Sequence, residues 1–209
     1  MKHIYLFTVL LLLVFSGLFI SCQTEITLSV KADNSVDIKF EGGVGSAFTN
    51  MILSASGSDA GIENGIDADA VSYELAKAGF ENVRVESKGS SVRINMTDQK
   101  RSSYIFSSGI VQFDSGRLKT KITRKSLEDF YTSADEQTRM ILDLFLSPVF
   151  NNDTMSESEY LEMLASFYGE GAAKEVQESF VKINLIGKDG KKEEQHIALS
   201  QLLCGSFNY

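Results

Sequence analysis

ITLSVKADNSVDIKFE, residues 26–41, is the stretch that decides the fold. Apolar and polar residues alternate on both sides of a polar turn, which predicts two strands that each bury one face. We expect Val30 to lie opposite Ile38. Leu28 then lies opposite Phe40, all apolar side chains share one face, and the turn has an odd number of residues. The stretch therefore predicts an antiparallel hairpin that covers a core on one side only.

Further strands and helices follow along the chain. The alternation predicts a hairpin of 82–87 with 91–97, in which Val83 and Val85 face Ile94 and Val92, and a hairpin of 110–113 with 118–123. Helices are expected at 46–55, from Asp67 or Asp69 to a stop at Gly79 with Phe80 folded back on Leu75, and over much of 126–178, where Ser156-Glu157-Ser158-Glu159 forms a capping box. Strand patterns return at 180–186 and 193–198.

Because strands resume after the helical region and no Pro- or Ser-rich linker separates the two, one sheet is favoured over two independent domains. The predicted fold class is α+β: a mainly antiparallel sheet of hairpins with a helical layer or insertion at about residues 126–178. Residues 22–209 would form a single domain outside the cytoplasm, and residues 1–21 a signal peptide.

The composition limits the possible functions. The chain has 209 residues, of which 43% are hydrophobic and 23% charged, with one proline, two cysteines and two histidines. This is typical of a globular protein and leaves too few histidines and cysteines for a multidentate site of these ligands. The net charge of −8 disfavours binding to nucleic acid.

The N-terminus reads as a membrane-inserting segment, since one basic residue precedes an uncharged apolar run from Ile4 to Ile20. Gly17-Leu18-Phe19-Ile20-Ser21-Cys22 then resembles a bacterial lipobox, although Phe19 stands where leucine is usual. The resemblance implies that the signal is cut before Cys22, that the Cys22 thiol carries a diacylglyceryl group, and that the new amine is acylated. The alternative is a retained helix that ends at an unmodified Cys22.

The resemblance extends loosely over most of the chain. The turn at 30–36, and 143–150 followed by 155–161, are similar to uncharacterised lipoproteins of spirochaetes. Such a protein is anchored in the cell membrane or outer membrane and faces the periplasm or the cell exterior. The family offers no assigned activity to transfer. Loss of Lys2 with the signal changes the net charge from −8 to −9 and leaves His196 as the remaining histidine.

Candidate chemistry is sparse, and no catalytic, cofactor or metal site is predicted. Gly42-Gly43-Val44-Gly45 lacks the third glycine and the lysine of phosphate-binding loops, and the acidic loop 59–69 lacks EF-hand spacing, although a calcium site there stays open. His196 has no serine elbow with which to form a triad. Cys204 reads as a small buried hydrophobe. The carboxylate pairs are assigned to helix first turns and strand exteriors: Glu128-Asp129, Asp135-Glu136 and Glu193-Glu194.

Two surface features suggest partners. Basic residues on the third hairpin could meet anionic lipid headgroups or form a solvated face: Arg117, Lys119, Lys121, Arg124 and Lys125. An exposed apolar patch through Tyr160, Phe167 and Tyr168 would mark a structural subunit. We expect a non-enzymatic, lipid-anchored binding module with the membrane and an envelope protein or lipid as partners. The alternative is an extracytoplasmic hydrolase or lipid-handling enzyme.

Overall fold

The computed structural model describes residues 24–43, 45, 67–89, 91–133, 139, 142–143 and 155–204. The predicted signal peptide with Cys22, the helix at 46–55, the acidic loop up to residue 66, the pair Asp135-Glu136 and the end of the chain lie outside these residues. The described strands are β1 (Thr24–Val30), β2 (Val36–Gly43), β3 (Glu81–Lys88), β4 (Ser91–Asp98), β5 (Val111–Asp114), β6 (Arg117–Thr120), β7 (Phe180–Ile186) and β8 (Lys192–Ala198). The described helices are α3 (Ala68–Lys77), α4 (Tyr104–Ser107), α5 (Arg124–Ser133), α7 (Glu157–Tyr168), α8 (Glu170–Glu178) and α9 (Leu199–Leu203).

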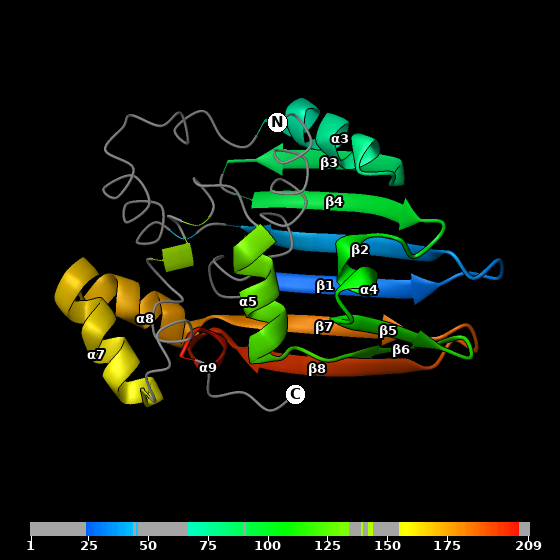
Figure 1. Ribbon diagram of the computed structural model, residues 1–209. Coiled ribbons are helices and arrows are strands. Elements are labelled where there is room, and N and C mark those ends of the chain that lie inside the picture. The colour runs from blue at the N-terminus through cyan, green and yellow to red at the C-terminus, as the bar shows by residue number, and fades with distance from the viewer. Residues whose placement is uncertain are drawn as a thin grey trace.

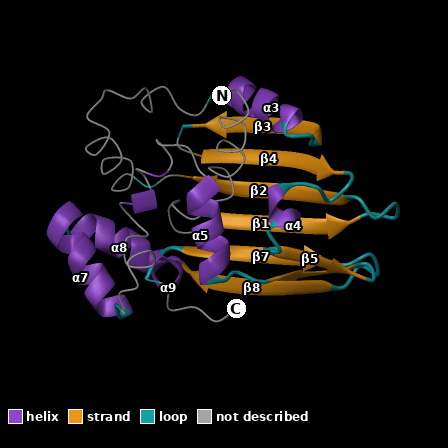
Figure 2. Ribbon diagram, viewed as in Figure 1, coloured by secondary structure: helices purple, strands orange, loops and turns teal. Residues whose placement is uncertain are grey.

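A six-stranded sheet in the order β3-β4-β2-β1-β7-β8, here the main sheet, organises the molecule (Figures 1 and 2). The predicted α+β class is confirmed, and strands from before and after the helical region do share this sheet. β1 lies near its middle, antiparallel to β2 and parallel to β7. The third hairpin departs from the prediction of one sheet, because β5 and β6 form a separate two-stranded sheet.

The register of the first hairpin also differs from the prediction. Val30 pairs with Val36 rather than Ile38, and Leu28 pairs with Ile38 rather than Phe40. The turn closes earlier than expected because the backbone N–H of Lys31 donates to the carbonyl of Ser35 at 2.9 Å. A slip of two residues keeps every side chain on its face, so the prediction of a one-sided hairpin with an odd turn is confirmed.

The second hairpin forms at the predicted place with a partly different register. Val85 lies opposite Ile94, but Val92 lies opposite Ser87, and the pairing is irregular between Glu81 and Arg84. This irregularity removes Val83 from the paired positions that a regular ladder would give it. The apolar positions of β4 nevertheless face the core, since Val92, Ile94 and Met96 are all buried.

Three predicted helix ends are confirmed in detail. Asp67 caps α3 by accepting from the N–H groups of Asp69 and Ala70, and Gly79 ends it with φ of 93°. The N–H of Phe80 donates to the carbonyl of Leu75 at 3.3 Å, as a Schellman stop requires. At the start of α7, Ser156 and Glu159 form the predicted capping box.

The elements form layers around the main sheet. α4, α5 and the β5-β6 sheet lie over one face, here the inner face, and form its cover (Figure 1). α7, α8 and α9 lie beyond the end of the sheet at which β1 begins. α3 lies alongside edge strand β3. The inner face carries the apolar side chains, which makes the space between sheet and cover the core. The most deeply buried of the large core side chains include Ile94, Leu127, Phe130, Leu142, Leu164 and Leu185.

Candidate apolar cavity

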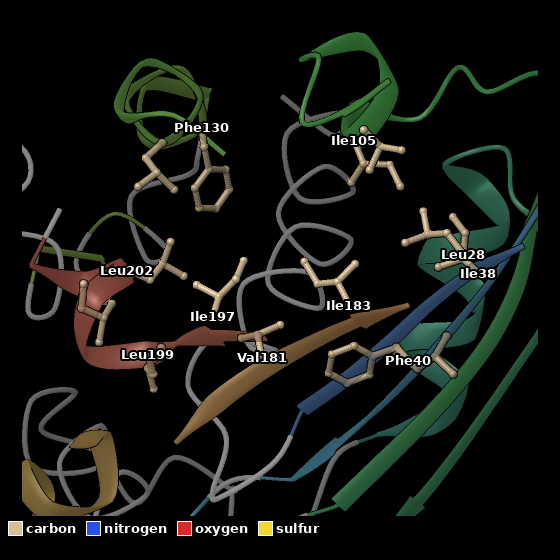
Figure 3. Close-up of a cluster of buried hydrophobic side chains, with 14 of the residues drawn as sticks. Leu28, Ile38, Phe40, Ile105, Phe130, Val181, Ile183, Ile197, Leu199 and Leu202 are labelled. Atoms are coloured by element: carbon tan, nitrogen blue, oxygen red, sulfur yellow. The ribbon is translucent and has the colours of Figure 1, made fainter. Parts of the chain in front are cut away.

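A cavity of about 100 Å³ lies between the inner face and its cover. Figure 3 shows the side chains of Ile105 and Phe130 on the cover pointing towards the sheet, where Ile183, Ile197 and Val181 lie. Leu202, on α9, closes one side. The described lining residues are Ile26, Leu28, Ile38, Phe40, Phe80, Ile94, Met96, Ile105, Ile110, Val111, Thr120, Ile122, Leu127, Val181, Ile183 and Leu202.

Strand alternation aims these side chains at the cavity. Ile26 and Leu28 point to the same face of β1, and their partners on β7 are Ile183 and Leu185. Ile38 and Phe40 follow the same rule on β2. The sequence predicted this apolar face, but it gave no sign that a cavity lies above it, because the cover comes from a different part of the chain.

The lining holds no ionisable side chain among the described residues. Its one polar side chain is that of Thr120, whose hydroxyl donates to the side-chain oxygen of Gln195. Apart from the Thr120 hydroxyl, which is engaged with Gln195, the described wall holds no side chain of the types that act as general acid, general base or nucleophile. The described lining can therefore hold an apolar group.

The residues that line the cavity differ in their exposure to solvent. Ile94 and Leu202 are each only 1% exposed, whereas Ile26, Ile110 and Ile122 are half-buried. Ile26 lies on β1, Ile110 comes just before β5, and Ile122 comes shortly after β6.

The volume sets a size limit for a ligand. An empty apolar cavity of about 100 Å³ costs roughly 2 kcal/mol of stability at about 24 cal/mol per Å³. An apolar group that fills the cavity would recover contacts of this order. Because an engineered cavity of about 150 Å³ binds benzene, this one is large enough for a few carbon atoms, such as a segment of an alkyl chain.

His196 lies outside this cavity. It is exposed on β8, where its Nε2 lies 2.8 Å from the Oε1 of Glu194 and its ring stacks on Phe180 at 5.5 Å. The His196 hydrogen bond, followed by those from Lys192 and Lys182, lowers the pKa of Glu194 to about 2. The polar and ring partners of His196 among the described residues are Glu194 and Phe180, which do not assemble a catalytic triad around it.

Cys204 follows α9 and is buried, with 4% of its surface exposed. Its thiol donates to the carbonyl of Gln201 at 3.6 Å. The prediction that it serves as a small buried hydrophobe is therefore confirmed.

The glycine-rich stretch after β2 is not built for phosphate. β2 runs through Gly42 and Gly43 as part of an antiparallel ladder with β4. A side chain at Gly45 would overlap the carboxylate of Glu175 on α8. A negative charge therefore stands next to this glycine, where a phosphate-binding loop would present donors to an anion.

The residues of the predicted basic cluster are exposed, but Arg124 and Lys125 begin α5 rather than lying on the third hairpin. Three residues of the cluster lie beside carboxylates. These pairs are Arg117 with Asp189 at 3.4 Å, Arg124 with Glu128 at 2.8 Å, and Lys125 with Asp129 at 2.8 Å. Much of the cluster's charge is therefore compensated locally, which weakens its attraction for an anionic surface.

The predicted aromatic patch on α7 is wrong in part. Tyr160 is fully buried, and burial raises its pKa well above the ordinary value. Tyr168 is half-buried, and Phe167 is 75% exposed. Tyr160 turns inward because it follows the capping box and lies on the same helix face as Leu164, which is also fully buried.

Comparisons with protein-family models, curated proteins and solved structures found no match. Within the described ranges, no three or more His, Cys, Asp and Glu side chains gather to hold a metal ion. Among the same residues, no helix is long and apolar enough to cross a membrane. The likeness to spirochaete lipoproteins stays a prediction from the sequence.

Proposed function

We propose that this protein is a lipid-anchored component of the bacterial cell envelope that binds an apolar ligand, such as a segment of a lipid acyl chain, without altering it. The observation that carries the ligand part is the cavity, whose described lining is apolar except for Thr120. The lipobox-like sequence ending at Cys22 supports the anchor. In this proposal the membrane is both the site of attachment and the source of the ligand.

The alternative is an extracytoplasmic hydrolase or lipid-handling enzyme. An enzyme would require a titratable group in contact with its substrate. His196 and the pair Glu193-Glu194 are the strongest candidates of the sequence, but none of them lines the cavity. Binding without reaction is therefore the function that the described wall supports best.

The ligand part is tested by the lipids that copurify with the full-length protein in detergent. Val181 and Val111 are buried residues of the cavity wall, so Val181→Phe and Val111→Phe place a larger side chain inside it. We expect each variant to lose most of the lipid that solvent extraction releases from the wild type, while the unfolding temperature stays equal or rises. Solvent extraction followed by mass spectrometry separates this lipid from chains attached covalently.

Val85→Phe is the matched control, because Val85 is a half-buried strand valine that does not line the cavity. This variant should retain lipid like the wild type. Unchanged retention by both cavity-filling variants would contradict the proposed ligand site. The anchor is tested separately: Cys22→Ala should abolish acylation and processing, and a variant that still partitions fully with membranes in processed form would disprove it.

A further inference from the structure

The predicted anchor lies next to one end of the main sheet. β1 begins at Thr24, which is fully buried between β2 and β7. Two residues of extended chain span at most about 7 Å, so an acylated Cys22 stays within that distance of Thr24. No long linker is available between the strand and the lipid, and this end of the sheet must therefore lie close to the bilayer.

The helices α7 and α8 lie at the same end. α8 leads directly into β7, whose residue Val181 pairs with Thr24. α8 also reaches the end of β2, where its Glu175 lies against Gly45. Figure 1 accordingly shows α7 and α8 beyond the end of the sheet at which β1 begins.

The end of α7, Gly169 and the start of α8, together residues 163–174, are here named the α7–α8 tip. It carries Phe167, which is 75% exposed and whose ring centroid lies 6.3 Å from that of Tyr168. One acidic and one basic residue, Glu170 and Lys174, leave the tip without net charge. The other glutamates of the two helices lie outside it, at positions 157, 159, 162, 175 and 178.

An exposed aromatic ring on a neutral surface beside a lipid anchor fits one partner, the interface of the anchoring bilayer. Phenylalanine on the apolar face of an interfacial helix lies at the boundary of headgroups and acyl chains, whereas clustered carboxylates are repelled by anionic lipids. We infer that the α7–α8 tip lies against the bilayer that holds Cys22, with Phe167 in its interfacial layer. The inference rests on the proposed lipid anchor but not on the apolar ligand.

The chain has no tryptophan, so a single introduced indole reports on one position. The variant Phe167→Trp places it at the α7–α8 tip. Tyr73→Trp is the matched control, because Tyr73 is the other exposed large hydrophobic residue within the described ranges, at 67%. It lies on α3, which runs along edge strand β3, away from α7 and α8. Both exposed positions should accept the change without loss of folding.

Each full-length protein is purified in detergent, shown by mass to be acylated at Cys22, and reconstituted into phosphatidylcholine vesicles with brominated acyl chains. We expect the emission of Phe167→Trp to fall by about twofold relative to unbrominated vesicles, because an interfacial indole lies within reach of the bromines. Emission from Tyr73→Trp should stay unchanged. Added phosphatidylglycerol should weaken the quenching of Phe167→Trp by bringing anionic lipid towards the flanking glutamates.

The outcomes separate the anchor from the orientation. Acylated protein that floats with the vesicles while Phe167→Trp is not quenched would overturn the inference and leave the anchor intact. Equal quenching of both indoles would also overturn it, because the domain would then have no preferred orientation. Protein that is neither acylated nor vesicle-bound would disprove the proposed anchor, and the inference with it.

Discussion

The two faces of the main sheet are made by the same strands and use opposite chemistry. On the inner face Leu28 and Leu185 are each 2% exposed. On the outer face, ion pairs form along and across the strands: Glu41 lies 2.7 Å from Lys39 on the same strand and 2.8 Å from Arg93 on β4. Burial fixes which residues face inward, whereas the outer ion pairs are screened by solvent and contribute little each.

The outer face also contains the partners that compensate a pair of like charges on adjacent strands. Glu25 and Glu41 lie directly opposite each other on β1 and β2, where two like charges repel. Glu41 is compensated by its two cations, and Glu25 accepts a hydrogen bond from Asn184 at 2.6 Å. Strand order therefore matters to the polar face as well, because β7 supplies the partner of a carboxylate on β1.

The largest expected effect comes from the inner face. Leu185→Ala removes a side chain that is 2% exposed and leaves a new void, so we expect a loss of about 2–5 kcal/mol in the free energy of unfolding. Arg93→Ala on the outer face is the control, and its loss should stay within about 1 kcal/mol because the ion pairs of Arg93 are half-exposed. Urea unfolding followed by circular dichroism measures both, and equal losses would contradict the division between the faces.

A smaller effect is expected at a buried polar position of the outer face. Asn184 is 1% exposed and donates to Glu25 and to the hydroxyl of Thr27. Asn184→Ala should cost about 1–2 kcal/mol, because it leaves the acceptors on β1 partly unsatisfied. Asn95→Ala, at a half-buried outer position of β4, should change stability by no more than about 0.5 kcal/mol. If the two substitutions cost the same, the bridge from β7 to β1 has no structural role.

Local pattern predicted which face each strand buries, but not where each strand lies. The slip of two residues in the first hairpin shows the limit: alternation has a period of two, so it fixes the face and leaves Val30 free to pair with Val36 or Ile38. The parallel contact of β1 with β7 joins residues more than 150 positions apart. No local signal in either strand specifies that partner.

The candidate site was harder to predict than the fold. Its wall combines residues from both ends of the chain and from the cover, such as Leu28, Ile105 and Leu202, and each of them reads in sequence as ordinary core. The sequence-based candidates His196 and Cys204 both lie outside the cavity lining. A cavity is a property of how packed layers fail to fill a volume, and hydrophobic periodicity carries no information about it.

The smallest effect is expected from a single carboxylate of the outer face under acid. The hydrogen bond from His196, followed by that from Lys192, lowers the pKa of Glu194 from the ordinary 4.5 to about 2. Because the pKa is lower in the folded state, the stabilisation is complete above pH 4.5 and is lost as pH falls towards 2. Glu194→Gln should therefore lower the urea midpoint at neutral pH, and its difference from wild type should shrink across this window. Glu193→Gln is the control, because it removes the same charge from the opposite side of β8. If the difference in urea midpoint between this variant and wild type shrinks by the same amount as pH falls, net charge causes the effect, and the contacts of Glu194 do not.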